Sequence, residues 1–120
     1  MEIPLTRREL DAMQVLWDRS SGTVAEVREH IETEDALAYT TVLTVLRVLE
    51  RKGLVRHEAF RKAYRYYPKV SRADVRRGVL ARLIRDLYGG QPDALLEDLL
   101  ERYPVLPKVL ERMRRVLDKR

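Results

Sequence analysis

Hydrophobic residues recur at three- and four-residue steps along most of the chain, which is the spacing of amphipathic helices. Two such helices are predicted near the N-terminus, because Thr6 with Glu9 and Thr23 with Glu26 each form the Thr-x-x-Glu signature of a capped helix start. A turn composition over residues 19–22 separates them. The residues along or near the apolar stripe of the first helix are Leu10, Met13, Val15, Leu16 and Trp17, and those of the second helix are Val24, Val27 and Ile31.

The stretch from Ala38 to Gly53 separates into two faces when it is turned about 100° per residue as a helix. Gly53 predicts its end, since glycine favours the left-handed conformation of a helix cap. One face is aliphatic, while the other carries hydroxyl and guanidinium groups, which hydrogen-bond phosphates and base edges in the major groove of DNA. An ordinary amphipathic helix with a solvated polar face has the same pattern. The aliphatic residues are Val42, Val45, Leu46 and Leu49, and the outward ones are Thr40, Thr44, Arg47 and Arg51.

A β-hairpin is predicted directly after this helix. Residues 54–59 and 63–67 are rich in aliphatic and aromatic side chains, Phe60, Arg61 and Lys62 form a short basic tip, and Pro68 ends the second strand. A helix followed by such a hairpin is the winged helix-turn-helix plan, in which the helix enters the major groove and the wing lies along the backbone. Arg61 and Lys62 are therefore candidate phosphate contacts, although exposed turns are also basic for solubility alone.

Three further helices are predicted from Ser71 onward, the first with a Ser71–Asp74 capping signal and the third after Pro107. Their apolar stripes are broader than so thin an assembly can bury by itself, which favours a two-fold homodimer. Folding back onto the N-terminal domain is the alternative. A dimer would place two reading helices on successive major grooves, roughly 34 Å apart. The candidate dimer contacts are Leu80, Leu83, Leu87, Leu96, Leu99, Leu110, Met113 and Leu117.

These elements predict a mainly α fold with a small β-hairpin: a winged helix-turn-helix domain over residues 1–70 and a helical dimerisation region over residues 71–120. Charge is segregated along the chain. Residues 1–38 hold four Lys or Arg against nine Asp or Glu, residues 39–70 eight against two, and the rest twelve against eight. The positive excess therefore coincides with the predicted reading helix and wing, and it indicates a polyanionic partner.

Other classes of protein are not favoured. The glycines form no phosphate-cradling loop or dinucleotide fingerprint, and no Gly-x-Ser-x-Gly occurs, so no enzyme is predicted. His30 and His57 have no neighbours at metal-ligand spacing, and cysteine is absent, so neither a metal nor another cofactor is expected. The chain has no apolar run that could cross a bilayer and no signal-peptide pattern, and we expect a soluble cytoplasmic protein without membrane insertion.

Five motifs in order carry a family resemblance: Leu16-Trp17, Thr23–Val27, Ala38–Thr44, Leu49–Val55 and Ala63–Pro68. Together they closely resemble the bacterial penicillinase-repressor family, which includes regulators of β-lactamase and methicillin resistance and copper-responsive repressors. The resemblance implies a homodimeric transcriptional repressor that binds double-stranded, palindromic operator DNA through the third helix and dimerises through its C-terminal helices. The candidate DNA contacts are Thr40, Thr41, Thr44, Arg47, Arg51, Lys52, Arg61 and Lys62.

In its antibiotic-responsive branch, the family resemblance also implies induction by cleavage in the C-terminal region, triggered by a membrane sensor metalloprotease. The cleavable Asn-Phe pair of the family aligns with Asp98-Leu99, which is a different bond. Many relatives have an arginine at the position of Val48 and a glycine at the wing tip. The copper branch uses cysteine clusters, and a chain without cysteine cannot be that kind of sensor.

A second hypothesis comes from another functional class: a winged-helix module for protein–protein assembly that binds no DNA. In such a module the third helix would dock through aromatic or aliphatic anchors on its outward face. Only Leu43 and Val48 could serve as anchors there, whereas threonine and arginine dominate. The composition of this face therefore favours DNA.

Overall fold

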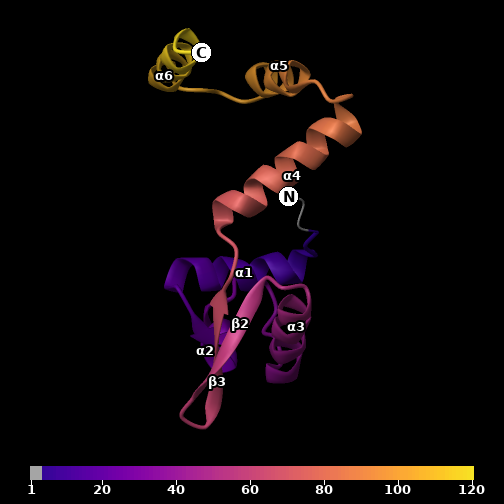
Figure 1. Cartoon of the computed structure of the whole chain (residues 1–120), viewed down its shortest axis with the longest axis vertical. Helices are drawn as coiled ribbons and strands as arrows, with labels where there is room; N and C mark the ends of the chain where they lie inside the picture. Colours follow the sequence, from indigo (N-terminus) through magenta and orange to yellow (C-terminus); the bar gives the residue numbers. More distant parts are fainter. Residues whose placement is uncertain (1–3) are drawn as a thin grey trace. The chain divides into compact units, whose positions relative to one another are not determined.

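The computed structural model describes residues 4–120 and divides the chain into two compact units, Met1–Val79 and Leu80–Arg120, here called the winged unit and the C-terminal unit. The predicted mainly α fold with a small hairpin is confirmed (Figure 1). The elements are α1 (Arg7–Arg19), β1 (Gly22–Thr23), α2 (Val24–His30), α3 (Tyr39–Arg51), β2 (Val55–Phe60), β3 (Ala63–Pro68), α4 (Arg72–Leu87), α5 (Pro92–Arg102) and α6 (Pro107–Asp118).

The helix starts follow from their capping residues. The hydroxyl of Thr6 accepts a hydrogen bond from the Glu9 amide, and Thr23 does the same for Glu26, both at 3.2 Å. These bonds satisfy amides that the first turn of a helix leaves without a partner. The capping pattern in the sequence therefore located the starts of α1 and α2.

The end of α3 is set by Gly53, whose φ of 78° lies in the left-handed region. The Gly53 amide donates to the carbonyl of Glu50, and the Leu54 amide donates to that of Leu49, each at 3.0 Å. This pair of bonds is the Schellman motif, and Leu49 and Leu54 are both buried, which adds its usual apolar contact. The chain is thereby turned from α3 directly into the hairpin.

The sheet has three antiparallel strands in the order β1-β3-β2. In the hairpin, Val55 pairs with Pro68 and Phe60 pairs with Ala63, so Phe60 belongs to the strand and the tip is only Arg61 and Lys62. The expected three-residue tip is corrected accordingly. The strand β1 was not predicted, because two residues are too few to show a period.

The core of the winged unit lies between its three helices and the sheet. It includes Val15, at the edge of the predicted stripe of α1, and Tyr66 from the central strand. The sequence places the domain boundary between residues 70 and 71, whereas the compact units divide within α4, since Val75 is buried in the core of the winged unit. The fully enclosed side chains are Met13, Leu16, Val27, Val42, Leu46, Leu49, Val55 and Tyr66.

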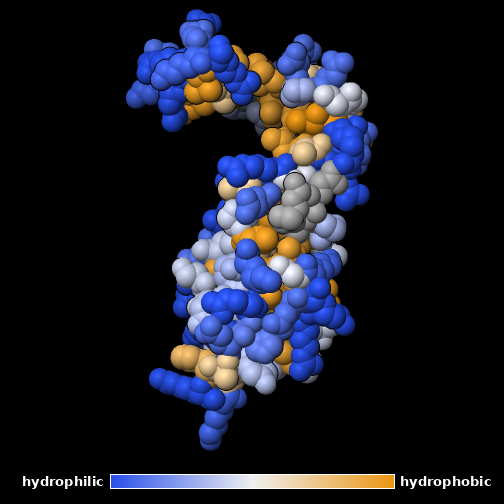
Figure 2. Space-filling view, viewed as in Figure 1, coloured by the Kyte–Doolittle hydropathy of each residue, from blue (hydrophilic) through white to orange (hydrophobic). Residues whose placement is uncertain are grey.

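The C-terminal unit contains the end of α4 with α5 and α6, and neither α5 nor α6 buries a residue. Figure 2 shows apolar surface gathered over this unit with hydrophilic atoms around it. Leu83 is half-buried, and the other candidate dimer residues are exposed: Leu80, Leu87, Leu96, Leu99, Leu110, Met113 and Leu117. Over residues 4–120, the structure has no helix with the length and apolar character needed to span a bilayer.

Candidate nucleic-acid interface

The two faces of α3 divide as its sequence pattern predicts. Val42, Leu46 and Leu49 are buried, whereas the opposite face is open to solvent. Leu43 and Val45 are half-buried and pack against the core. The candidate DNA contacts on α3, at its C-cap and at the wing tip are all exposed: Thr40, Thr41, Thr44, Arg47, Arg51, Lys52, Arg61 and Lys62.

The two arginines on this face are available to an external partner. Neither Arg47 nor Arg51 forms a hydrogen bond or an ion pair with any part of the chain that the structure describes. By contrast, the hydroxyl of Thr44 donates a hydrogen bond to the carbonyl oxygen of Thr40 at 2.9 Å. The face therefore presents two guanidinium groups and a threonine whose proton is already donated.

Lys52 differs from the other candidates, because its ammonium group binds within the fold. It pairs with the carboxylate of Glu9, which is only 6% exposed, and it also donates to the carbonyl of Pro4 at 3.3 Å. Burial raises the pKa of Glu9, but hydrogen bonds from Lys52 and Thr6 and the charge of Lys52 together lower it below its ordinary value. Lys52 thus joins the end of α3 to the start of α1.

The wing tip presents two cations on a tight turn. Arg61 has a φ of 58°, a left-handed conformation that glycine adopts more easily. Its guanidinium carbon lies 5.4 Å from the centre of the Phe60 ring, and Lys62 has no hydrogen-bonding or ionic partner among residues 4–120. The chain therefore forms this left-handed turn with an arginine, which adds a positive charge at the tip.

Arg65, on β3 of the wing, is a structural residue that the sequence pattern did not reveal. Its guanidinium donates to both carboxylate oxygens of Glu26 at 3.1 and 2.7 Å and to the Ser21 hydroxyl at 3.1 Å. The hydrogen bond from Arg65 lowers the pKa of Glu26, although burial opposes it. Arg65 also lies over the Phe60 ring at 4.5 Å. It therefore anchors the wing to the start of α2.

A second link joins the wing to α3. The Nδ1 atom of His57 lies 2.6 Å from a carboxylate oxygen of Glu50, and its ring is 4.6 Å from that of Tyr64. The neighbouring Tyr66 is enclosed, and burial raises its pKa above the ordinary value. In the sequence His57 had no visible partner. In the fold it connects the reading helix with the hairpin.

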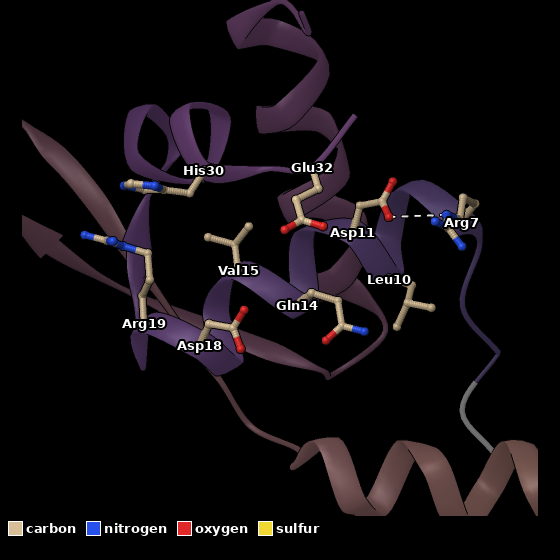
Figure 3. Close-up of a pocket in the computed structure, with 9 residues that line it drawn as sticks. All are labelled: Arg7, Leu10, Asp11, Gln14, Val15, Asp18, Arg19, His30 and Glu32. Carbon is tan, nitrogen blue, oxygen red and sulfur yellow. Dashed lines mark ion pairs between the residues drawn. The ribbon is translucent and has the colours of Figure 1, made fainter. Parts of the chain in front are cut away.

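A cleft of about 470 Å³ lies beside α1 and the segment that ends α2 (Figure 3). Its charged side chains are of both signs, and Arg7 forms an ion pair with Asp11 at 3.3 Å. Among residues 4–120 there is no group of three His, Asp or Glu side chains that could hold a metal ion. The lining residues are Arg7, Leu10, Asp11, Gln14, Val15, Asp18, Arg19, His30 and Glu32.

Three helices, a hairpin directly after the third and an outward face of threonine and arginine define a winged helix-turn-helix domain. Over residues 5–119 the sequence matches the model of one family, described as penicillinase repressor. The chain belongs to the penicillinase repressor family, and the predicted family is thereby confirmed.

Individual relatives agree with this assignment. The transcriptional regulator BlaI of Mycobacterium tuberculosis is 34% identical over 96 residues, which are 78% of this chain and 70% of that protein. The methicillin resistance regulatory protein MecI of Staphylococcus aureus is 21% identical over 116 residues, 97% of this chain and 94% of that one. The solution structure of the DNA-binding domain of the repressor BlaI has a TM-score of 0.53 at 26% identity, covering 62% of this chain and 93% of that one.

A further similar structure holds nucleic acid. It is the solution structure of Bacillus licheniformis BlaI in its monomeric form in complex with the blaP half-operator. Its TM-score is 0.51 at 26% identity, and the match covers 62% of this chain and 90% of that one. The winged-helix fold is thus shared with a protein whose monomer was observed on half of an operator.

Proposed function

We propose that this protein is a sequence-specific transcriptional repressor that binds double-stranded operator DNA through α3 and the β2–β3 wing. The proposal rests mainly on the exposed face of α3, where Arg47 and Arg51 form no hydrogen bond or ion pair with the described part of the chain. Guanidinium groups on a helix of this kind bind guanine edges and phosphates. The excess of eight basic over two acidic residues in residues 39–70 supplies the local positive charge that phosphate binding requires.

The proposal includes a homodimer on a palindromic operator. It is supported by the apolar side chains that α5 and α6 leave exposed, such as Leu96, Leu110 and Met113. A groove of about 530 Å³ in the C-terminal unit is lined mainly by such side chains. A second copy would cover this surface and hold two reading helices at the spacing of successive major grooves. The groove residues are Leu96, Val109, Arg112, Met113, Val116 and Leu117.

Induction by proteolysis is a further part of the proposal, with a membrane sensor protease as the partner in that pathway. The aligned bond, Asp98-Leu99, lies inside α5, and Asp98 accepts a hydrogen bond from the Tyr88 hydroxyl at 2.8 Å. A protease binds its substrate in an extended form, so this turn of α5 must unwind before cleavage. Because α5 fully buries none of its residues, we expect this local unwinding to cost little free energy.

The assembly-module alternative is less well supported. Leu43, one of its two possible anchors, packs against the core of the winged unit. That leaves Val48 as a single half-buried aliphatic side chain among exposed polar ones. One such residue is a poor basis for a protein interface, which usually has a cluster of apolar anchors.

Replacing Arg47 with alanine tests the proposed function directly. We expect Arg47→Ala to weaken binding to a duplex selected from a random pool by about 1–3 kcal/mol and to relax the preference at one base pair, as for a guanidinium that binds a guanine edge. Fluorescence anisotropy on the selected duplex and its single-base variants measures both effects. An equal loss on random DNA would instead identify Arg47 as a phosphate contact, and no selective binding by the unmodified protein would refute the proposal.

Replacing Lys62 with alanine tests the wing. A residue that neutralises one phosphate should contribute about one unit to the slope of log affinity against log salt, and its loss should weaken binding to all sequences alike. Affinities measured across a series of salt concentrations give this slope. The exchange Glu34→Gln, in the acidic loop before α3, is the control for a general charge effect. An unchanged slope in Lys62→Ala would place the tip outside the interface.

A further inference from the structure

We propose that Thr44 and Val48 form an apolar strip on α3 that recognises the methyl group of a thymine in the operator. This inference rests on the proposed function, because it names the base feature that the same helix reads. Thr44 and Val48 are four residues apart, so their side chains lie one helical turn apart on the outward side of α3.

The Thr44 hydroxyl is already engaged within α3. It donates its proton to the carbonyl oxygen of Thr40 at 2.9 Å, as threonine often does one turn back in a helix. A hydroxyl has one proton, so Thr44 has none left to donate to a base. The side chain is nevertheless exposed, and besides the lone pairs of its oxygen it offers an outside partner the γ-methyl. Thr44 therefore has no proton to donate to a base, and it presents its γ-methyl beside an oxygen that can only accept.

The neighbour of Thr44 on this surface is Val48. Val48 lies four residues later, so its methyl groups continue the surface that the Thr44 methyl begins. Val48 is only half-buried and belongs neither to the core nor to the partly buried side chains packed against it. Arg47 and Arg51 are on the same exposed face. The result is a narrow apolar strip that both guanidinium groups flank along one side, since helical geometry places Arg47 and Arg51 next to Thr44 on the same edge.

The major groove of DNA offers an apolar group that such a strip could contact. Thymine alone among the four bases presents a methyl group there, and the methyl of threonine is a known type of partner for it. Guanidinium groups beside the strip would bind guanine edges or phosphates and hold the helix in register. Thr44 lies in the second turn of α3, near the helix end that contacts base edges in helix-turn-helix proteins. The strip is therefore in a position to recognise a thymine.

The test compares thymine with deoxyuridine, which lacks only the methyl group. A duplex selected from a random pool by the unmodified protein is synthesised with each thymine replaced in turn by deoxyuridine. We expect one position in each half-site to lose affinity by about three- to five-fold, the effect of one buried methyl group. The other positions should change little.

Three substitutions identify the side-chain groups that recognise this position. Thr44→Val keeps the methyl and removes the hydroxyl, so its preference for thymine should persist. Thr44→Ser keeps the hydroxyl and removes the methyl, so thymine and deoxyuridine should become equivalent. Val48→Ala should reduce the same preference, because the strip is shortened. Circular dichroism and thermal melting verify that each variant is folded.

The possible outcomes separate the two proposals. If the protein selects no duplex from the pool, the proposed function fails. If it binds a selected duplex but no replacement by deoxyuridine weakens binding, or if Thr44→Ser keeps the full preference, the strip does not read thymine and DNA binding stands. Loss of the preference in Thr44→Val would assign the recognition to the hydroxyl and overturn the inference.

Discussion

A chain that ends at Asp98 is expected to bind a full palindromic operator about 10² to 10⁴ times more weakly than the intact chain. The shortened chain lacks the end of α5 and all of α6, and with them the exposed apolar side chains Leu110 and Met113. It keeps the winged unit, whose core lies entirely within residues 1–79. Two winged units that are no longer linked must bind their half-sites independently, so the advantage of a high local concentration is lost.

The measurement is a titration of the full operator and of a single half-site with both chains, together with sedimentation at micromolar concentration. The half-site affinity should be the same for both chains, because α3 and the wing are unchanged. The full-length variant Leu110→Asp provides a second route to the monomer, since it places a charge on the apolar face of α6. Unchanged binding of the full operator by the shortened chain would exclude the C-terminal helices as the point of control.

The exchange Lys52→Met is expected to destabilise the winged unit by about 2–3 kcal/mol at neutral pH. It removes the cation that pairs with Glu9, whose carboxylate is almost fully buried. A buried charge that loses its partner costs roughly 3–5 kcal/mol, and a smaller loss is expected here because Lys52 is 35% exposed and solvent already screens the pair. Urea unfolding followed by circular dichroism measures the loss. The double variant Glu9→Leu with Lys52→Met should recover much of it, since neither charge then remains.

The same pair predicts how the destabilisation depends on pH. The pKa of Glu9 is lowered in the folded protein, so the ion pair stabilises the fold above the ordinary value of 4.5 and loses this effect as the pH falls through the lower, folded value. Without Lys52, the effect of burial is less well opposed, so the pKa of Glu9 should be higher than in the unmodified protein. The stability difference between the two proteins should therefore be largest near pH 7 and shrink as the pH falls from the higher folded pKa of the variant to the lowered folded pKa of the unmodified protein. A constant difference across this range would show that Glu9 is not its origin.

The DNA-binding behaviour of Lys52→Met distinguishes a structural role from a direct contact. Lys52 was among the candidate phosphate contacts, yet its ammonium group is bound to Glu9 and Pro4. If its role is structural, the folded variant should keep the salt dependence of the unmodified protein. A slope reduced by about one unit would indicate that Lys52 leaves Glu9 to bind a phosphate.

The local signals in the sequence were sufficient for the helices and the family. Thr6, Thr23 and Gly53 mark helix ends through bonds to residues at most a few positions away, so the pattern of one segment contains the whole interaction. The outward face of α3 also follows from one segment, since helical geometry alone sets which side chains share a face. The sequence by itself therefore determined the winged helix-turn-helix domain and the exposed residues of its reading helix.

Only the tertiary structure decided which polar residues serve the fold. Lys52 and Glu9 are 43 residues apart and Arg65 and Glu26 are 39 apart, so no local pattern links them. The strand β1 likewise exists only because β3 lies beside it. The residue type of Thr44 also did not reveal whether its hydroxyl proton is available to a partner. The structure shows that this proton is donated to the carbonyl oxygen of Thr40. Long-range packing selects partners by position in space, and for this reason it separated the cations that hold the domain together from those left exposed to solvent.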